Sequence, residues 1–318
     1  MPTQQDRVEA LLDKQEAAVR RRFLAFIRDI NSAAVLASIA DLLERGDLEG
    51  ALSIVDSFIV RFADVLPTIQ QVVGEATALE LAATIGENLL AIGFDPSHPR
   101  AAALARASRL TLIREMIPDQ RRAIRQAVGR AFDEGTGSFS TAARFRGAIG
   151  LTSGQEKWVA SFEARLRNLD RRALAMELRD RRHDRTIERA ILNRKPLTET
   201  QIAAMTERYR ARALIYRSEN IARTEALRAT SQAREESLMQ MIEQTGIAPE
   251  RVERVWNPTR DKRLRDAHRA MDKQRRPIDV RFTDGDGNRL MWPGDPDAPP
   301  STTVNCRCSV TFEIKPLA

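Results

Sequence analysis

The chain has few cysteines, histidines and aromatic residues, and this scarcity excludes several kinds of protein. It has only 2 cysteines and 3 histidines among 318 residues. Two cysteines one residue apart cannot hold a large fold together by disulfides, so we expect a protein of a reducing compartment. No apolar run approaches the ~20 residues of a membrane-spanning helix. The first residues lack a basic segment followed by an apolar one, so we expect no secretory signal.

Signatures of catalysis are scarce as well. No glycine-rich phosphate loop, Ser/His/Asp set or pair of catalytic carboxylates stands out, so few residues are candidates for an active site. Aromatic residues make up 5% of the chain, which argues against binding of single-stranded nucleic acid by base stacking. We therefore expect that the protein is not an enzyme.

Charge, by contrast, is abundant and unevenly distributed. Residues 1–100 carry a net charge of −6, residues 101–230 carry +12 and residues 231–318 carry +1, within a total of +7. Most basic residues are arginines, which bind phosphate bidentately, although a GC-rich source would also raise the arginine content. On the phosphate interpretation, the basic region contacts double-stranded DNA without sequence preference. The candidates for these contacts are Arg121, Arg122, Arg125, Arg171, Arg172, Arg181 and Arg182.

The spacing of apolar residues predicts a mostly α-helical chain with a small C-terminal α+β module. Long helices come first, and a short antiparallel sheet lies at the C-terminus. From the charge distribution and the breaks in the helical pattern, we expect three regions. They are an acidic helical domain over residues 1–95, a basic helical region over 96–245 and the α+β module over 246–318.

Several helix boundaries can be predicted from local signals. A break is expected at Pro118, because proline removes a backbone donor from a helix. Thr152 or Ser153 is suited to cap the N-terminus of the next helix. A further long helix is expected to start at the capping residue Thr198 and to run to about Met241.

The last hundred residues contain both cysteines, one of the three histidines and two of the three tryptophans. Within them, Val252–Trp256 alternates as a strand does, and Thr259–Met271 is expected to form a short helix. Asn305–Ile314 is expected to form the final strand. Rare residue types gathered in this way indicate a compact module with a constraint of its own.

Two groups in this module are candidates for a site. Asp261, Arg265 and His268 would share one face of a helix, as a metal or catalytic site or, more commonly, as a salt-bridged surface. Cys306 and Cys308, on a strand, would point their sulfurs to one side, where together with His268 they could bind zinc. Buried thiols that serve as small apolar side chains are the commoner outcome. We expect no cofactor and keep zinc at these three residues as the alternative.

Five motifs follow one another along the C-terminal third of the chain. They are Ile221-Ala222-Arg223-Thr224-Glu225, Trp256, Asp261-x-Arg263-x-Arg265-x-x-His268, Pro293-Gly294-Asp295 and Val304-Asn305-Cys306-Arg307-Cys308. In this order they resemble the phage head-morphogenesis family, the Mu F-like minor head proteins, over about residues 198–314. A variant of the family pattern has His-Pro where this chain has Thr303-Val304, so one candidate metal ligand is missing. The resemblance assigns a structural or docking role to Arg223, Thr224, Glu225, Trp256, Asp261, Arg265, His268, Asn305, Cys306 and Cys308.

The resemblance implies a minor capsid protein of a tailed phage or prophage that acts in head morphogenesis and DNA packaging. The partners it implies are the portal protein, the major capsid or scaffolding protein and double-stranded DNA, and no membrane. The implied location is the capsid interior of the virion, and the host cytoplasm during assembly. The alternative function is a metal-dependent enzyme that acts on nucleic acid through the C-terminal His/Asp/Cys cluster.

Overall fold

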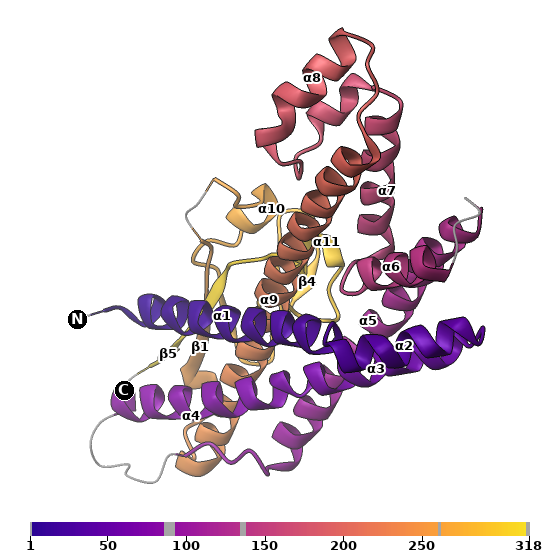
Figure 1. Ribbon diagram of the computed structural model, residues 1–318. Coiled ribbons are helices and arrows are strands. Elements are labelled where there is room, and N and C mark those ends of the chain that lie inside the picture. Colours follow the sequence, from indigo (N-terminus) through magenta and orange to yellow (C-terminus); the bar gives the residue numbers. More distant parts are fainter. Residues whose placement is uncertain (1, 86–92, 134–137, 260–261, 316–318) are drawn as a thin grey trace. The chain divides into compact units, whose positions relative to one another are not determined.

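The structure, a computed structural model, describes residues 2–85, 93–133, 138–259 and 262–315. It confirms the predicted fold class, because long helices precede a small antiparallel sheet at the C-terminus (Figure 1). The longer helices are α1 (Gln4–Ile30), α2 (Ala33–Glu44), α3 (Leu48–Ala63), α4 (Val65–Ile85), α5 (Pro99–Asp133), α6 (Ser138–Ala148), α7 (Ser153–Arg167), α8 (Asp184–Leu192) and α9 (Glu199–Thr245). Single helical turns are η1 (Arg171–Ala175), η2 (Arg181–His183), η3 (Pro249–Arg251), α10 (Asp266–Arg269) and α11 (Pro300–Thr303).

Contacts group the chain into two compact units, each assembled from separate segments. Unit 1 consists of residues 1–23, 62–112 and 220–318, and unit 2 consists of residues 24–61 and 113–219. Helices α1, α5 and α9 each contribute residues to both units. The division into three consecutive regions stays a prediction.

Unit 1 contains the C-terminal sheet. Its strands β2 (Arg275–Pro277), β1 (Val252–Asn257) and β5 (Ser309–Ile314) lie in that order and are antiparallel. A separate hairpin is formed by β3 (Phe282–Thr283) and β4 (Arg289–Leu290). The predicted strand at Val252–Trp256 is therefore confirmed.

The core of unit 1 lies between this sheet and the C-terminal half of α9. Leu238 and Met241 of α9 pack in one buried cluster with Val252 and Trp256 of β1 and Phe312 of β5. Burial of apolar surface stabilises a fold by about 25 cal/mol per Å². The three-stranded sheet is too small to be stable alone, so it depends on α9 to bury its apolar face.

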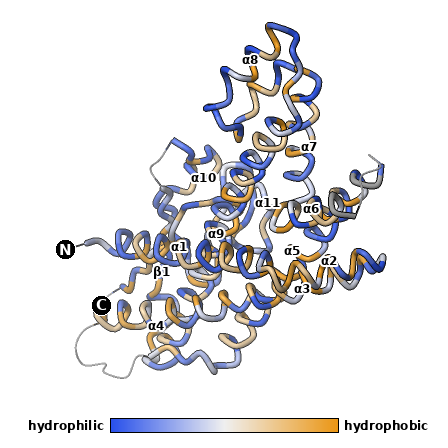
Figure 2. Tube along the Cα trace, viewed as in Figure 1, coloured by the Kyte–Doolittle hydropathy of each residue, from blue (hydrophilic) through white to orange (hydrophobic). Residues whose placement is uncertain are grey.

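Helix α4 also belongs largely to the interior of unit 1, and Figure 2 shows that it is predominantly hydrophobic. Its buried residues include Ile69, Val73 and Leu81. Among the described residues, no single helix is long and apolar enough to span a membrane, and only α1 and α2, taken as a bent pair, pass by length and composition.

Unit 2 has a core of its own, built mainly from α7, α8 and the N-terminal part of α9. Phe162 of α7 stacks on Tyr209 of α9 with ring centroids 4.5 Å apart. Val159, Leu166 and Ile187 are buried in the same cluster. Aromatic stacking of this kind adds about 0.5–1.5 kcal/mol to the contribution from burial.

Two predicted helix starts are confirmed by reciprocal capping. Thr152 accepts a hydrogen bond from the backbone N–H of Gln155, and the Gln155 side chain accepts one from the backbone N–H of Thr152. Thr198 and Gln201 make the same pair of bonds at the start of α9. Each box satisfies two backbone donors that the first turn would otherwise leave unpaired.

Three local predictions are wrong. Helix α5 continues through Pro118, because buried residues on both sides of the proline, such as Met116 and Ile124, keep one helical face packed. Within the described part of the segment predicted as a helix from Thr259 to Met271, only Asp266–Arg269 is helical. At the start of the segment, the hydroxyl of Thr259 donates a hydrogen bond to the carbonyl of Arg307, so a tertiary contact takes the place of a helical one.

The third error concerns the last strand, which begins at Ser309 and leaves both cysteines in the turn before it. Asn305 has φ 57°, in the left-handed region, and the backbone N–H of Cys306 donates to the carbonyl of Thr303. A left-handed residue cannot continue a strand. The pairing of β5 with β1 starts only at Ser309, which faces Asn257.

Candidate functional site

Three side chains of metal-binding type meet inside unit 1. His268 comes from α10, and Cys306 and Cys308 come from the turn before β5. The Nδ1 atom of His268 lies 3.6 Å from the Sγ of Cys306 and 3.4 Å from the Sγ of Cys308. All three residues are buried, and their ligand atoms lie within 4.8 Å of one another. The structure therefore brings together the three residues that the sequence offered as zinc ligands, although the cysteines do not lie on a strand.

Trp256 fixes the position of His268. The indole lies edge-on to the imidazole, with ring centroids 6.0 Å apart and an interplanar angle of 80°. Trp256 also packs against Phe282 at 5.2 Å. The Nε2 atom of His268 is buried without a hydrogen-bond partner in the part of the chain that the structure describes. These contacts hold the ring with Nδ1 directed at the two sulfurs.

The two thiols do not ionise independently. The thiol of Cys308, as a hydrogen-bond donor, lowers the pKa of Cys306 well below its usual value; burial opposes this effect and His268 supports it. The interaction with Cys306, followed by burial, raises the pKa of Cys308. The pKa values of the two thiols are therefore shifted in opposite directions, downward for Cys306 and upward for Cys308.

The motif Arg223-Thr224-Glu225 on α9 ties that helix to the cysteine-bearing turn. The hydroxyl of Thr224 accepts a hydrogen bond from the backbone N–H of Asn305 at 3.2 Å. The guanidinium of Arg223 donates to the side-chain oxygen of Asn305 at 3.4 Å. Glu225 forms a buried ion pair with Arg228, one turn further along, at 3.3 Å. The hydrogen bonds from Arg223 and Thr224 hold the turn that carries Cys306 and Cys308 against α9.

The motif Pro293-Gly294-Asp295 packs against the same helix. Gly294 has φ 82°, and a Cβ atom there would lie 3.3 Å from the Cα of Arg228. Only glycine combines this backbone conformation with so close an approach to a helix. Asp295 is buried and accepts hydrogen bonds from the backbone N–H of Met291 at 2.6 Å and from Arg281 at 3.0 Å.

Arg254 of β1 is a central residue that the sequence reasoning missed. Its side chain is fully buried and donates to the carbonyls of Pro277, Val280 and Met291 at distances of 2.7–3.3 Å. It also pairs with Glu235 of α9 at 3.4 Å. Burial raises the pKa of Glu235 to about 7, against the attraction of Arg254. Arg254 lies two residues from both Val252 and Trp256, on the strand face that these apolar residues occupy, and this position was the signal that could have revealed it.

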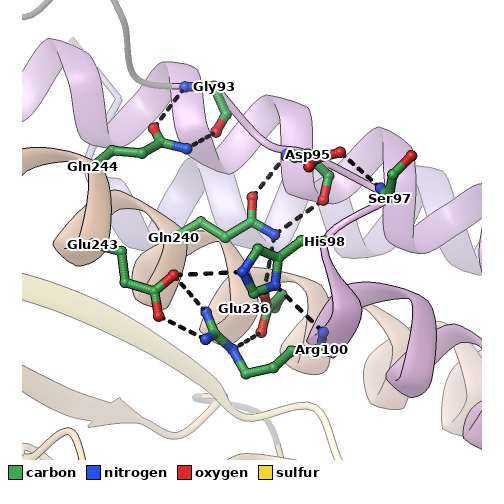
Figure 3. A network of polar contacts seen from close by, with 9 residues as sticks. All are labelled: Gly93, Asp95, Ser97, His98, Arg100, Glu236, Gln240, Glu243 and Gln244. Atoms are coloured by element: carbon green, nitrogen blue, oxygen red, sulfur yellow. Dashed lines mark hydrogen bonds and ion pairs between the residues drawn. The ribbon is translucent and has the colours of Figure 1, made fainter.

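A second polar network that the sequence reasoning missed connects the segment after residue 92 to α9 (Figure 3). The side-chain amide of Gln240 accepts from the backbone N–H of Asp95 at 2.7 Å and donates to its carbonyl at 3.1 Å. Gln244 makes the corresponding pair of bonds with Gly93. Each glutamine side chain thus makes with one residue the same two hydrogen bonds that the backbone of a neighbouring strand would make. The spacing of these glutamines, four residues apart on one helix face, was the available signal.

Charged groups extend this network. Arg100 donates to Glu236 at 3.0 Å and to both oxygens of Glu243 at 2.6 and 3.1 Å. His98 lies against the same two carboxylates at 3.4 and 3.6 Å (Figure 3). The segment expected to separate two domains is therefore attached to α9 within unit 1.

Of the other two residues of the predicted helix face, the structure describes Arg265, which does not join the cluster of His268, Cys306 and Cys308. Asp261 lies outside the described residues. Arg265 precedes α10 as its N-cap and donates its guanidinium to the carbonyl of Val304. Arg265 thus supports the cysteine-bearing turn, and the shared helix face expected for Arg265 and His268 is not formed, because the helix is only one turn long.

The seven arginines proposed to contact DNA all lie in unit 2. Five of them form ion pairs with carboxylates of the same unit: Arg121 with Asp56 and Glu49, Arg122 with Asp119, Arg125 with Glu49, Arg172 with Asp170, and Arg182 with Asp180. Arg171 and Arg181 are exposed and have no ion pair among the described residues. A guanidinium that is already paired must give up its carboxylate before it can bind a phosphate. Arg171 and Arg181 are therefore better placed than the other five to contact phosphate.

The two units differ less in net charge than the three consecutive regions of the chain, because each unit combines acidic and basic segments. Unit 1 has 25 basic and 24 acidic residues, a net charge of +1, and unit 2 has 26 and 20, a net charge of +6. Part of the acidic N-terminal region, including Glu49 and Asp56, neutralises arginines of α5. Nearly all of the excess positive charge therefore belongs to unit 2.

Unit 1 also contains a cavity of about 420 Å³ beside the metal-binding group. Its lining includes Cys306, Arg307 and Thr259 on one side and Glu16 and Arg223 on the other. The cavity gives solvent a path to the neighbourhood of the buried cysteine.

Comparison with known proteins gives one match. The model of the family described as Phage Mu protein F like protein matches residues 122–311, which is more than half of the chain and includes every motif from Arg223 to Cys308. No curated protein and no solved structure matches the chain.

Proposed function

The chain belongs to the Phage Mu protein F like family of head-morphogenesis proteins, and from this membership we propose that it is a minor capsid protein that associates with the portal protein as a phage head is assembled. The observation that carries the proposal is the family match over residues 122–311, which covers most of unit 2 and the C-terminal module of unit 1. A protein of this family is virion-associated. We place it in the capsid interior, after assembly in the host cytoplasm.

The arrangement of unit 1 supports an interaction role. The motifs that indicate the family contact one another or the helix that carries them: Arg223 and Thr224 hold Asn305, and Gly294 packs against Arg228. Groups used in this way build a rigid docking module, and they are not available for chemistry on a substrate. The portal protein, together with the major capsid or scaffolding protein, is the partner that the family suggests.

Portal association is tested by co-sedimentation. The full chain should sediment with procapsids that contain portal and should stay in the supernatant with procapsids assembled without it. Arg289→Glu, which changes an exposed arginine of unit 1, serves as a charge control with unchanged folding. Equal sedimentation with both kinds of procapsid would show that the partner is a shell or scaffolding protein instead.

We further propose that unit 2 contacts packaged double-stranded DNA through phosphate groups. Its net charge of +6 and the exposed, unpaired Arg171 and Arg181 support this. Phosphate contacts release counterions, so the affinity should fall steeply with salt and ignore sequence, with a slope of about −0.9 per contact in a log–log plot.

A mobility-shift series over salt concentration measures that slope. Arg171→Glu and Arg181→Glu should each reduce the magnitude of the slope by about one contact, whereas Arg289→Glu should leave it unchanged. Absence of any shift at low salt would remove DNA from the list of partners while leaving the portal proposal in place.

A further inference from the structure

Beyond the assembly role, we propose that His268, Cys306 and Cys308 bind one Zn²⁺ ion, whose fourth ligand is a water molecule from the adjoining cavity. The proposal does not depend on portal or DNA binding. It rests on geometry, burial, charge and connectivity within unit 1.

The distances fit tetrahedral zinc. Zinc–sulfur bonds of about 2.3 Å and zinc–nitrogen bonds of about 2.0–2.1 Å at tetrahedral angles place each sulfur about 3.6 Å from the nitrogen. The observed separations from His268 Nδ1 are 3.6 Å to Cys306 Sγ and 3.4 Å to Cys308 Sγ. Both nitrogen–sulfur separations thus match those of a tetrahedral zinc site, and the three ligand atoms lie within 4.8 Å of one another.

Charge and burial also fit the ion. A buried divalent cation is stable only when its charge is compensated, and two thiolates with a neutral imidazole compensate it fully. Zinc is favoured over magnesium or calcium by a ligand set of sulfur and imidazole nitrogen without carboxylates. The backbone N–H of Cys308 donates to the Sγ of Cys306 at 3.4 Å, a bond that supports a thiolate at this position.

The number of protein ligands is set by the surroundings. Among the described residues, the group of His, Cys, Asp and Glu side chains that could hold this ion contains only these three. Cys306 also lines the cavity of about 420 Å³, so water can reach the remaining position. The site therefore has two sulfur ligands, one nitrogen and one oxygen.

The ion would connect segments that are distant in sequence. His268 precedes Cys306 by 38 residues and Cys308 by 40, and β2, β3 and β4 lie between them. Because an unfolded chain does not hold the ligands together, the free energy of binding contributes to folding of the module. Binding replaces the thiol protons, which are released to solvent as the two zinc–sulfur bonds form.

The test uses the untagged full chain, expressed with added zinc and dialysed against metal-free buffer. Elemental analysis should find about one zinc per chain, and X-ray absorption at the zinc edge should show two sulfurs and two nitrogen or oxygen ligands. Cys306→Ser, Cys308→Ser and His268→Gln should each lower the zinc content at least several-fold. His183→Gln, which changes a histidine of unit 2, should leave it unchanged.

Substitution with cobalt keeps the proposal testable if a variant folds poorly. Cobalt added to the metal-free wild-type chain should produce the visible bands of a tetrahedral ion and a thiolate-to-metal charge-transfer band, and zinc should abolish both. A folded wild-type chain that holds no zinc and gives no cobalt spectrum would overturn the proposal and leave a thiol–imidazole hydrogen-bond cluster. Four sulfur ligands would overturn the ligand set by showing an ion shared between two chains.

Discussion

Replacement of Arg254 by methionine should be one of the most destabilising single changes in unit 1. Methionine has a similar length and keeps most of the packing on Phe282, over whose ring the guanidinium lies at 5.2 Å. It removes the side-chain donor to the carbonyls of Pro277, Val280 and Met291. These carbonyls belong to the segments before and after the hairpin, so Arg254 bonds both segments to β1.

The magnitude follows from the number of groups left without a partner. The carbonyl of Pro277 keeps a second donor, the backbone N–H of Val280 at 3.2 Å, so two carbonyls lose their donor. At about 1–3 kcal/mol for each, the cost is roughly 2–6 kcal/mol. The lower half of this range applies, because water can enter around a shortened side chain. The loss of the ion pair with Glu235 adds little, since this carboxyl, with its pKa raised to about 7 by burial, can take up a proton. We expect a decrease of about 3 kcal/mol in the free energy of unfolding.

The assay is urea unfolding followed by tryptophan fluorescence, in which Trp256, two residues from Arg254, reports on the module. Arg254→Lys is the matched control, because it keeps the charge while one ammonium group cannot reach three separated carbonyls. It should lose about half as much stability as Arg254→Met. A loss below about 1 kcal/mol for Arg254→Met would refute the reasoning, since a typical net hydrogen bond alone contributes that much.

Three further changes test other parts of the structure. In the folded protein the pKa of Glu235 is raised to about 7, against an ordinary value of 4.5. Between these two pH values the folded state keeps a proton that the unfolded state loses. The free energy of unfolding should therefore fall by up to about 3 kcal/mol as the pH rises from 4.5 to 7. Glu235→Gln should flatten this fall in thermal melts, and an unchanged slope would exclude Glu235 as its source. Gly294→Ala should destabilise unit 1 by about 1–3 kcal/mol, because φ 82° is strained for alanine and its Cβ meets α9; wild-type urea midpoints would contradict this. Thr152→Ala should cost about 1 kcal/mol through loss of the capping box. Lys157→Ala, which changes an exposed residue of the same helix, is the control, and equal effects of the two would refute the assignment of Thr152 as the cap.

The local patterns of the sequence determine a large part of this protein. The helical periodicity, the capping boxes at Thr152 and Thr198 and the alternation in Val252–Trp256 all depend on residues within a few positions of one another. Such short-range interactions act before any tertiary contact forms. The ordered motifs from Arg223 to Cys308 likewise indicate the family correctly, because a linear pattern of residue types is visible without the fold.

Only the tertiary structure decides which distant residues share a neighbourhood. It places Arg223 and Thr224 against Asn305, gives Arg254 its three carbonyls, and pairs five of the seven arginines proposed for DNA with carboxylates. It also brings His268 within 3.6 Å of both cysteine sulfurs through a left-handed turn at Asn305, where a strand was expected. The physical reason is that burial and the pairing of polar groups depend on neighbours in space, and these neighbours lie tens of residues away along the chain.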